Sequence, residues 1–180
     1  METAILKRDC EAVLIPYGEK ILLPAGDEVE ISQTLGGSFT VYSRGRLARI
    51  EGRDADALGK EIPAPTVPLP PATPGADVDE KLVWDQLRTC YDPEIPVNIV
   101  DLGLVYDLQI FALPEGGHRV EVKMTLTAPG CSMGEVIAQD AENKIRAIPN
   151  VKDVRVDLVW DPPWNQAMLS EAARLQLGLM

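Results

Sequence analysis

The C-terminal half of the chain shows the clearest alternation of hydrophobic and polar residues. Residues 120–126 place Val, Val, Met and Leu at every second position between charged residues and threonine, and residues 154–160 repeat the pattern. A period of two is typical of a strand with one buried face. Residues 104–111 form a further predicted strand, and the run Pro-Glu-Gly-Gly at 114–117 predicts a hairpin turn after it.

Three helices are predicted around these strands. The first carries an apolar stripe at helical spacing that reaches Cys90, and it ends at Asp92-Pro93. The second is predicted over 133–147 and the third over roughly 166–177. The resulting order α-β-β-α-β-α predicts a two-layer α/β (α+β) sandwich, with a right-handed crossover between the second and third strands.

The N-terminal part is predicted to be a small β-rich domain. Strand-like runs at 12–15 and 20–23 flank a Pro-Tyr-Gly turn signal, and a further hairpin is expected around Ser43-Arg44-Gly45. About sixty residues bury little core. We therefore expect this domain to be stabilised by packing against the second domain or against another subunit.

Residues 61–76 divide the chain. Six of these sixteen residues are prolines, which exclude a helix or a central strand and favour an extended, semi-rigid spacer. The net charge also changes, from −2 in residues 1–60 to −8 in residues 77–180. We predict a β-rich domain over 1–60, a Pro-rich linker over 61–76 and an α/β domain over 77–180.

The charge and the cysteine content narrow the classes of partner. A net charge of −11 disfavours nucleic acid, and the group Arg44, Arg46 and Arg49 has the spacing of a solvated strand face. No run of eighteen apolar residues is present, so no membrane span is expected. The N-terminus lacks a secretory pattern, and three cysteines do not make a disulfide scaffold, which indicates a reducing cytoplasm.

Cys131 is the strongest candidate for chemistry. It follows Thr127, Pro129 and Gly130 in a turn between a strand end and a helix start. Free N–H groups and the positive end of the helix dipole at such a place lower the pKa of a thiol. The thiolate is the form that binds a metal or attacks an electrophile. The alternative is a small buried cysteine in a tight turn.

A stiff acidic loop at 92–103 is the second unusual segment. Its two prolines restrict the backbone, and Glu94 and Asp101 are carboxylates in otherwise apolar surroundings. This loop and the Cys131 turn are both expected at the edge of the sheet, so we predict a site that they share. Either carboxylate could instead cap a turn.

The other thiols and the histidine do not complete a metal site. Packing explains Cys90 on the apolar stripe, whereas Cys10, before the first predicted strand, is a weak candidate ligand or resolving thiol. Structural zinc and iron–sulfur clusters generally need four ligands. His118 is the sole histidine and is expected at a solvated hairpin edge. Any cluster must therefore be shared between subunits or with a partner, use other ligands, or be held transiently.

Trp160 and Trp164 flank a rigid proline pair near the C-terminus. Two such rings can form an aromatic platform on which a partner protein docks. They can equally pack the last helix onto the sheet.

Taken together, these segments resemble a known family. Residues 92–106 and 125–131 resemble the small domain shared by several iron–sulfur maturation factors and by the PaaD-type accessory proteins of phenylacetyl-CoA oxygenase. Residues 159–164 and 168–174 look like the closing signature of its bacterial SufT branch, and the N-terminal extension is similar to SufT too. Many relatives have proline after the motif thiol, where this chain has Ser132.

The resemblance implies a non-enzymatic role, in which the protein helps the SUF assembly proteins to build clusters or deliver them to apo-proteins. It places the motif thiol on Cys131 and the motif acids on Glu94 and Asp101. Two alternatives stay open: a pure adaptor that docks clients without binding a cluster, and a thiol enzyme, for which no general base is visible. A shared cluster needs at least two chains, so a homodimer is one expected form.

Overall fold

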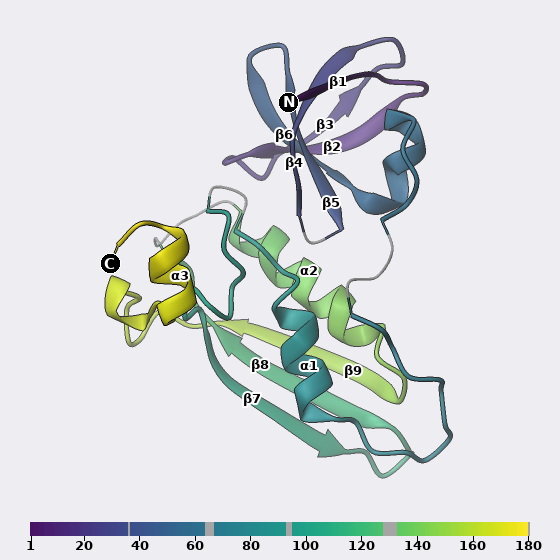
Figure 1. The fold of residues 1–180 in the computed structure, drawn as a ribbon. Coiled ribbons are helices and arrows are strands. Elements are labelled where there is room, and N and C mark those ends of the chain that lie inside the picture. Colours follow the sequence, from purple (N-terminus) through teal and green to yellow (C-terminus); the bar gives the residue numbers. More distant parts are fainter. Residues whose placement is uncertain (36, 64–66, 93–94, 128–132, 180) are drawn as a thin grey trace. The chain divides into compact units, whose positions relative to one another are not determined.

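The computed structural model describes five stretches of the chain, residues 1–35, 37–63, 67–92, 95–127 and 133–179 (Figure 1). Residues 93–96 aside, the chain divides into two compact units, Met1–Thr66 and Val67–Asp92 with Val97–Met180. Each unit holds its own sheet. The mixed α/β class predicted from the sequence is confirmed.

The first unit is built on one six-stranded antiparallel sheet, in the order β1-β4-β5-β6-β2-β3. The strands are Glu2–Ile5 (β1), Cys10–Ile15 (β2), Lys20–Leu23 (β3), Glu28–Leu35 (β4), Ser38–Ser43 (β5) and Arg46–Glu51 (β6). A 3-10 helix, η1 (Gly52–Leu58), follows β6. Val41 and Ile50 lie fully buried in the apolar core of this unit.

The turn between β5 and β6 follows from its sequence. Ser43 and Arg46 pair across a two-residue turn in which Arg44 and Gly45 both have positive φ, 50° and 81°. This geometry matches the right-handed twist of the two strands. The expected solvated arginine face holds for Arg44 and Arg46, which are exposed. It is wrong for Arg49, which is buried because β6 lies between β5 and β2.

Two features of the first unit were not anticipated. Residues 2–5 form β1, which pairs with β4 so that Ile5 lies opposite Glu28. Cys10 therefore does not precede the first strand but is the first residue of β2. The 3-10 helix η1 also carries no strong sequence signal. Both elements are short, and short elements give little periodicity to read.

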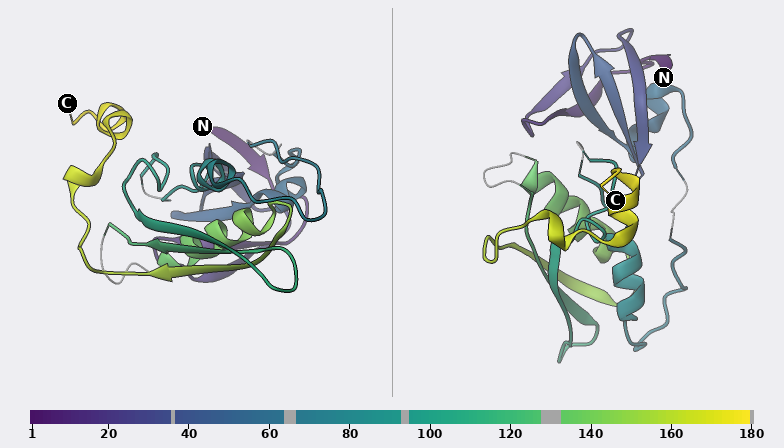
Figure 2. Two further views of the ribbon diagram at one scale, coloured as in Figure 1. Left: turned by 90° about the horizontal axis from the view of Figure 1, so that it is seen from below. Right: turned by 60° about the vertical axis from the view of Figure 1, so that its left-hand side comes forward.

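The second unit is a three-stranded sheet with two helices on one face (Figures 1 and 2). The strands β7 (Val105–Ala112), β8 (His118–Met124) and β9 (Val151–Leu158) lie in that order. β7 and β8 are antiparallel, whereas β8 and β9 are parallel and are joined through α2 (Gly134–Arg146). The other helix, α1, spans Glu80–Leu87.

β8 confirms the predicted alternation. Val120, Val122 and Met124 have no exposed surface, whereas Lys123 between them is exposed. The apolar face of the strand thus lies against the helices and forms the core of this unit. Ile137 of α2 is buried on the same side, as its place on the predicted helical stripe requires.

The first helix is shorter than its apolar stripe predicted. It begins after Asp79, whose side chain accepts a hydrogen bond from the Lys81 N–H at 2.9 Å. It ends at Leu87, so Cys90 lies beyond the helix although it is fully buried.

The single final helix expected over 166–177 is wrong. Two separate elements, η2 (Gln166–Met168) and α3 (Glu171–Gln176), occupy that stretch. Leu169 between them is extended, and the Ser170 hydroxyl caps α3 by accepting from the Ala173 N–H. The Ser170 N–H donates to the Asp101 carbonyl instead of continuing a helix. A tertiary contact therefore divides the segment.

Within the stretches that the structure describes, no helix has both the length and the apolar character that crossing a membrane requires.

Candidate functional site

The acidic loop is held in shape by Asn98. Its Oδ1 accepts from the N–H groups of Val100 and Asp101, at 3.1 and 2.9 Å, and its Nδ2 donates to the Asp101 Oδ2 at 2.7 Å. Asp101 is half-buried. Its carboxylate is thus oriented by a side chain of the same loop, and the side chain that caps this turn is Asn98 and not Asp101.

The loop is fastened to the end of β8. The Thr125 N–H donates to the Leu104 carbonyl at 2.7 Å, and Thr125 is almost fully buried. The Val159 N–H donates to the Met124 carbonyl at 2.8 Å, so the exit from β9 lies beside the same strand end. The chain continues from here through half-buried Thr127 toward the predicted Cys131 turn.

The start of α2 lies against this strand end as well. A Cβ added to Gly134, the first residue of α2, would collide with the Leu126 side chain. Met133 is the N-cap of the helix, and no side chain caps it. Leu126 and Gly134, on the two sides of the Cys131 turn, are therefore packed together, and among the described residues no N-cap side chain accepts a hydrogen bond from the first turn of α2.

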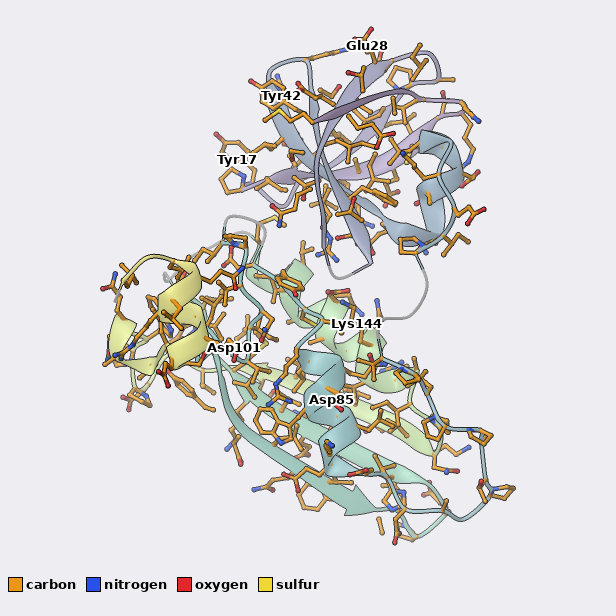
Figure 3. The ribbon with its side chains drawn as sticks, in the orientation of Figure 1. Tyr17, Glu28, Tyr42, Asp85, Asp101 and Lys144 are labelled. Atoms are coloured by element: carbon orange, nitrogen blue, oxygen red, sulfur yellow. The ribbon has the colours of Figure 1, made fainter. Side chains whose placement is uncertain are left out.

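The C-terminal segment crosses over the acidic loop. The Trp164 indole Nε1–H donates to the Leu102 carbonyl at 2.6 Å, and the Ser170 N–H donates to the Asp101 carbonyl at 2.8 Å. Gly103, with φ of 75°, faces the backbone of Met168 so closely that a Cβ would collide with it. Figure 3 shows Asp101 beside the C-terminal helix.

Three motif segments distant in sequence thus converge at one end of the second unit. We call this the motif end: the loop 97–104, the strand end 124–127 and the segment 159–170. Of the residues predicted for the site, four lie here: Asp101, Thr127, Trp160 and Trp164. Trp164 is half-buried, whereas Trp160 keeps 46% of its surface exposed. Glu94, Pro129, Gly130 and Cys131 lie outside the described residues.

Cys10 does not belong to the motif end, since it lies in the sheet of the first unit. Its thiol is buried, and its Sγ lies 3.4 Å from the Glu11 carbonyl. Burial raises the pKa of this thiol, and the negative charge of Asp54 raises it further. The protonated thiol is a poor ligand, so the environment of Cys10 disfavours the ligand role considered for it.

Cys90 and His118 are placed by packing. Cys90 has no exposed surface, and its Sγ lies 3.8 Å from the Gln86 carbonyl. His118 is less solvated than expected, with 13% of its side chain exposed and Nε2 3.6 Å from the Asp77 Oδ1. Across the described residues, no three His, Cys, Asp or Glu side chains gather as metal ligands would.

Sequence reasoning missed three residues that shape the motif end: Asn98, Gly103 and Ser170. The spacing of Asn98 before Asp101 is an Asx-turn signal that could have been found. The demand for glycine at position 103 comes from Met168, which no local pattern indicates.

Comparisons with known proteins match the second unit. The profile of a family described as iron–sulfur cluster assembly protein matches residues 80–158. A relative from Porphyromonas gingivalis, named Fe-S protein maturation auxiliary factor, is 48% identical over 101 residues, which are 56% of this chain and 92% of the relative. The Fe-S protein maturation auxiliary factor SufT of Staphylococcus aureus is 41% identical over 88 residues, 49% of this chain and 96% of that protein.

Among solved structures, a domain of unknown function from Bacillus anthracis is similar to this chain. The two are 34% identical, and the alignment covers 56% of this chain and 92% of that one, with a TM-score of 0.49.

Proposed function

Because the chain belongs to the family of iron–sulfur cluster assembly proteins, we propose that it acts in the maturation of iron–sulfur proteins. In this proposal it works in the cytoplasm beside the SUF assembly proteins and helps to deliver clusters to apo-proteins. The Cys131 thiolate is its exchangeable ligand for the cluster, and the protein carries out no catalytic reaction of its own.

The observation that carries the proposal is the convergence at the motif end. The loop with Asp101 is bonded to the end of β8 through Leu104 and Thr125, at 2.7 Å. The chain reaches Cys131 from that strand end and enters α2 after it. Cys131 precedes the start of α2 by three residues, and the loop that carries the oriented Asp101 carboxylate is bonded to the strand end before it. This setting favours the thiolate form.

The chemistry required is ligand exchange. The Cys131 thiol loses its proton to solvent, and its sulfur then coordinates an iron of the cluster, which is the cargo. A client thiolate displaces Cys131 from that iron, and Cys131 regains a proton. No electron changes hands. Asp101 and Glu94 would orient the thiolate or supply an oxygen ligand in the interval.

A cluster that takes four protein ligands cannot be held by this chain's thiols alone. The chain has three cysteines, and Cys10 and Cys90 are both buried in cores. The remaining ligands therefore come from a second copy or from a partner protein. Binding in this proposal is transient, as a protein that passes clusters on requires.

The test is a deletion strain in which the activity of an iron–sulfur enzyme such as aconitase is measured. Wild type and Cys10→Ala should restore the activity, whereas Cys131→Ala should not. Cys10→Ala is the matched control, because it removes a thiol from the other unit. If Cys131→Ala restores activity as well as wild type does, the thiol is not the ligand.

One observation favours the adaptor alternative, in which clients dock and no cluster is bound. Trp160 is 46% exposed at the motif end, and exposed tryptophans are frequent anchors in interfaces. The Trp164 indole N–H is already used by Leu102. Loss of client capture by Trp160→Ala, with capture retained by Cys131→Ala, would select the adaptor. The reverse result would select the cluster ligand.

A further inference from the structure

A cavity of about 320 Å³ opens on the first unit, at the end of the sheet where the β5–β6 turn lies. Its walls come from β2, β3, the turn between β3 and β4, and the β5–β6 hairpin. In Figure 3 the neighbouring residues Glu28 and Tyr42 mark this end of the unit. The volume lies at the lower end of the range for small-molecule sites, roughly 300 to 1,000 Å³.

The cavity has an apolar wall and a polar end. The apolar side chains are Leu14, Ile21, Leu22, Leu23, Pro24 and Ala48. The polar end consists of Asp27, Ser43, Arg44 and Arg46. Such a division, with apolar walls and a few converging polar groups, is typical of a site for a small ligand with an apolar body and one polar group.

The backbone of the turn places the polar end. Arg44 has a positive φ of 50°, a conformation in which Asn or Gly is usual and arginine is uncommon. Its guanidinium pairs with the Asp27 Oδ1 at 2.6 Å. The turn thus places an arginine beside the cavity even though its backbone conformation is less favourable for this residue.

Two polar atoms at this end have no hydrogen-bond partner among the residues that the structure describes. They are the Ser43 Oγ and the Asp27 Oδ2, and Ser43 is only 6% exposed. Buried hydroxyls in folded proteins almost always have partners, because an unmet one is destabilising. Ser43 lines the cavity, so rotation about χ1 can turn its hydroxyl toward a ligand there.

The charges at the polar end select the sign of the ligand. Asp27 balances Arg44, since the two form an ion pair. Arg46 is exposed, and among the described residues no carboxylate forms an ion pair with it. The polar end therefore carries one unbalanced positive charge, which a single carboxylate would neutralise.

We propose that this cavity binds a small monocarboxylate with an apolar chain. The carboxylate lies on Arg46 and accepts a hydrogen bond from Ser43, and the chain lies along Leu14, Leu22 and Ala48. Nothing in this site depends on the motif end, so the first unit would add ligand sensing to a chain whose other unit handles clusters.

The experiment titrates the full-length protein with octanoate and follows the backbone amides by NMR. The expected result is saturable shifts within 21–27 and 43–48. The uncharged probe 1-octanol should bind at least about tenfold more weakly, because it lacks the charge-assisted bond to Arg46.

Two variants locate the binding. Arg46→Gln should weaken octanoate binding about tenfold and leave 1-octanol binding unchanged. Arg53→Gln is the matched control, since Arg53 is an exposed arginine of the same unit outside the cavity, and it should bind like wild type. Leu22→Ser, at a residue 65% exposed and thus harmless to folding, should weaken both probes.

Three results would overturn the proposal. The first is an absence of saturable shifts at these residues with 10 mM octanoate. The second is equal affinity for octanoate and 1-octanol, which would remove the role of the charge. The third is the same loss of affinity in Arg53→Gln as in Arg46→Gln, which would mean that octanoate responds to surface charge in general.

Discussion

The two units differ in the side-chain contacts that join their distant segments. In the first unit, backbone bonds such as that from the Lys7 N–H to the Ala57 carbonyl are accompanied by ion pairs on the surface. Arg8 pairs with Asp54 and Asp56 at 2.8 and 2.7 Å, and Lys60 pairs with Glu2. Exposed ion pairs of this kind contribute little to stability and weaken with salt.

In the second unit the distant segments meet at backbone carbonyls. Trp164 donates to Leu102 across 62 residues, and the Tyr106 hydroxyl donates to Pro162 across 56. The direction of a backbone carbonyl is set by the conformation of its loop, so these hydrogen bonds form only when the loop keeps that conformation. The difference teaches that the first unit tolerates changes of charge, whereas the motif end depends on backbone geometry.

The largest effect is expected at Gly103. Gly103→Ala puts a side chain at positive φ and against the Met168 backbone, so we expect it to lower the unfolding free energy by about 3 kcal/mol. Gly116→Ala is the matched control, because Gly116 also has positive φ but open space around it, and it should lose about 1 kcal/mol.

Urea unfolding followed by tryptophan fluorescence measures both glycine variants. The three tryptophans, Trp84, Trp160 and Trp164, all lie in the second unit and report on it. Equal losses in the two variants would mean that the contact between the loop and the C-terminal segment adds nothing to stability.

The thiols of the two units should differ in reactivity. Iodoacetamide at pH 7.5 should label Cys131 at least about tenfold faster than Cys10, because burial raises the pKa of the Cys10 thiol and excludes the reagent. Peptide mass spectrometry of the labelled protein gives both rates. Adding urea should bring the two rates together. Comparable labelling in the native protein would contradict the assignment of the reactive thiol to the motif end.

A smaller effect is expected at Trp164. Trp164→Phe keeps an aromatic side chain but removes the indole N–H that donates to the Leu102 carbonyl, so we expect a loss of about 1 kcal/mol. Trp160→Phe, at an exposed position, should stay within about 0.5 kcal/mol of wild type. Thermal unfolding followed by circular dichroism compares the two. A larger loss at Trp160 would reverse their assigned roles.

The smallest effect concerns the ion pairs of the first unit. The hydrogen bond from Arg8 holds the pKa of Asp56 below its usual range. A lowered carboxyl pKa stabilises the fold above the usual range and loses this contribution as the pH falls through the folded-state value. Hydrogen exchange of β5 and β6 should therefore speed up slightly as the pH falls through and below the usual carboxyl range, after correction for the intrinsic rate.

The Arg8→Gln variant tests the origin of that change. Without the guanidinium the pKa of Asp56 returns toward its usual range, so the corrected exchange should depend less on pH. Added salt should also weaken the pH dependence of the corrected exchange, because it screens the ion pair. An unchanged pH dependence in the variant would assign the effect to other carboxylates.

Much of the secondary structure could be predicted because its apolar residues recur at a regular local spacing. The alternation of Val120, Val122 and Met124 gave β8, and the stripe with Ile137 gave α2 within one residue at each end. The turn at Gly45 gave the β5–β6 hairpin. Side chains on one face of a strand or helix share one environment, so a buried face shows as a regular repeat of apolar residues in the sequence. Elements without a pattern, such as β1, were missed.

The candidate site was only partly predictable. Asp101 was identified as a loop carboxylate, yet the bond from Asn98 that orients it was not foreseen. The final helix was predicted as continuous, whereas the contact between Ser170 and Asp101 divides it. The helix error arises because local propensity carries no information about a hydrogen bond to a residue far away in the chain. The missed bond from Asn98 depends in a similar way on the exact conformation of the folded loop.

The sequence by itself determined the strands and helices that repeat a clear local pattern, such as β8 and α2, and which residue types are available for chemistry. Only the tertiary structure decided that Cys10 is shielded, that Arg49 is buried and that the loop, the end of β8 and the C-terminal segment meet. The physical reason is the range of the interactions. Periodicity reflects neighbours a few residues apart, whereas burial and carbonyl acceptors at a site depend on the path of the whole chain.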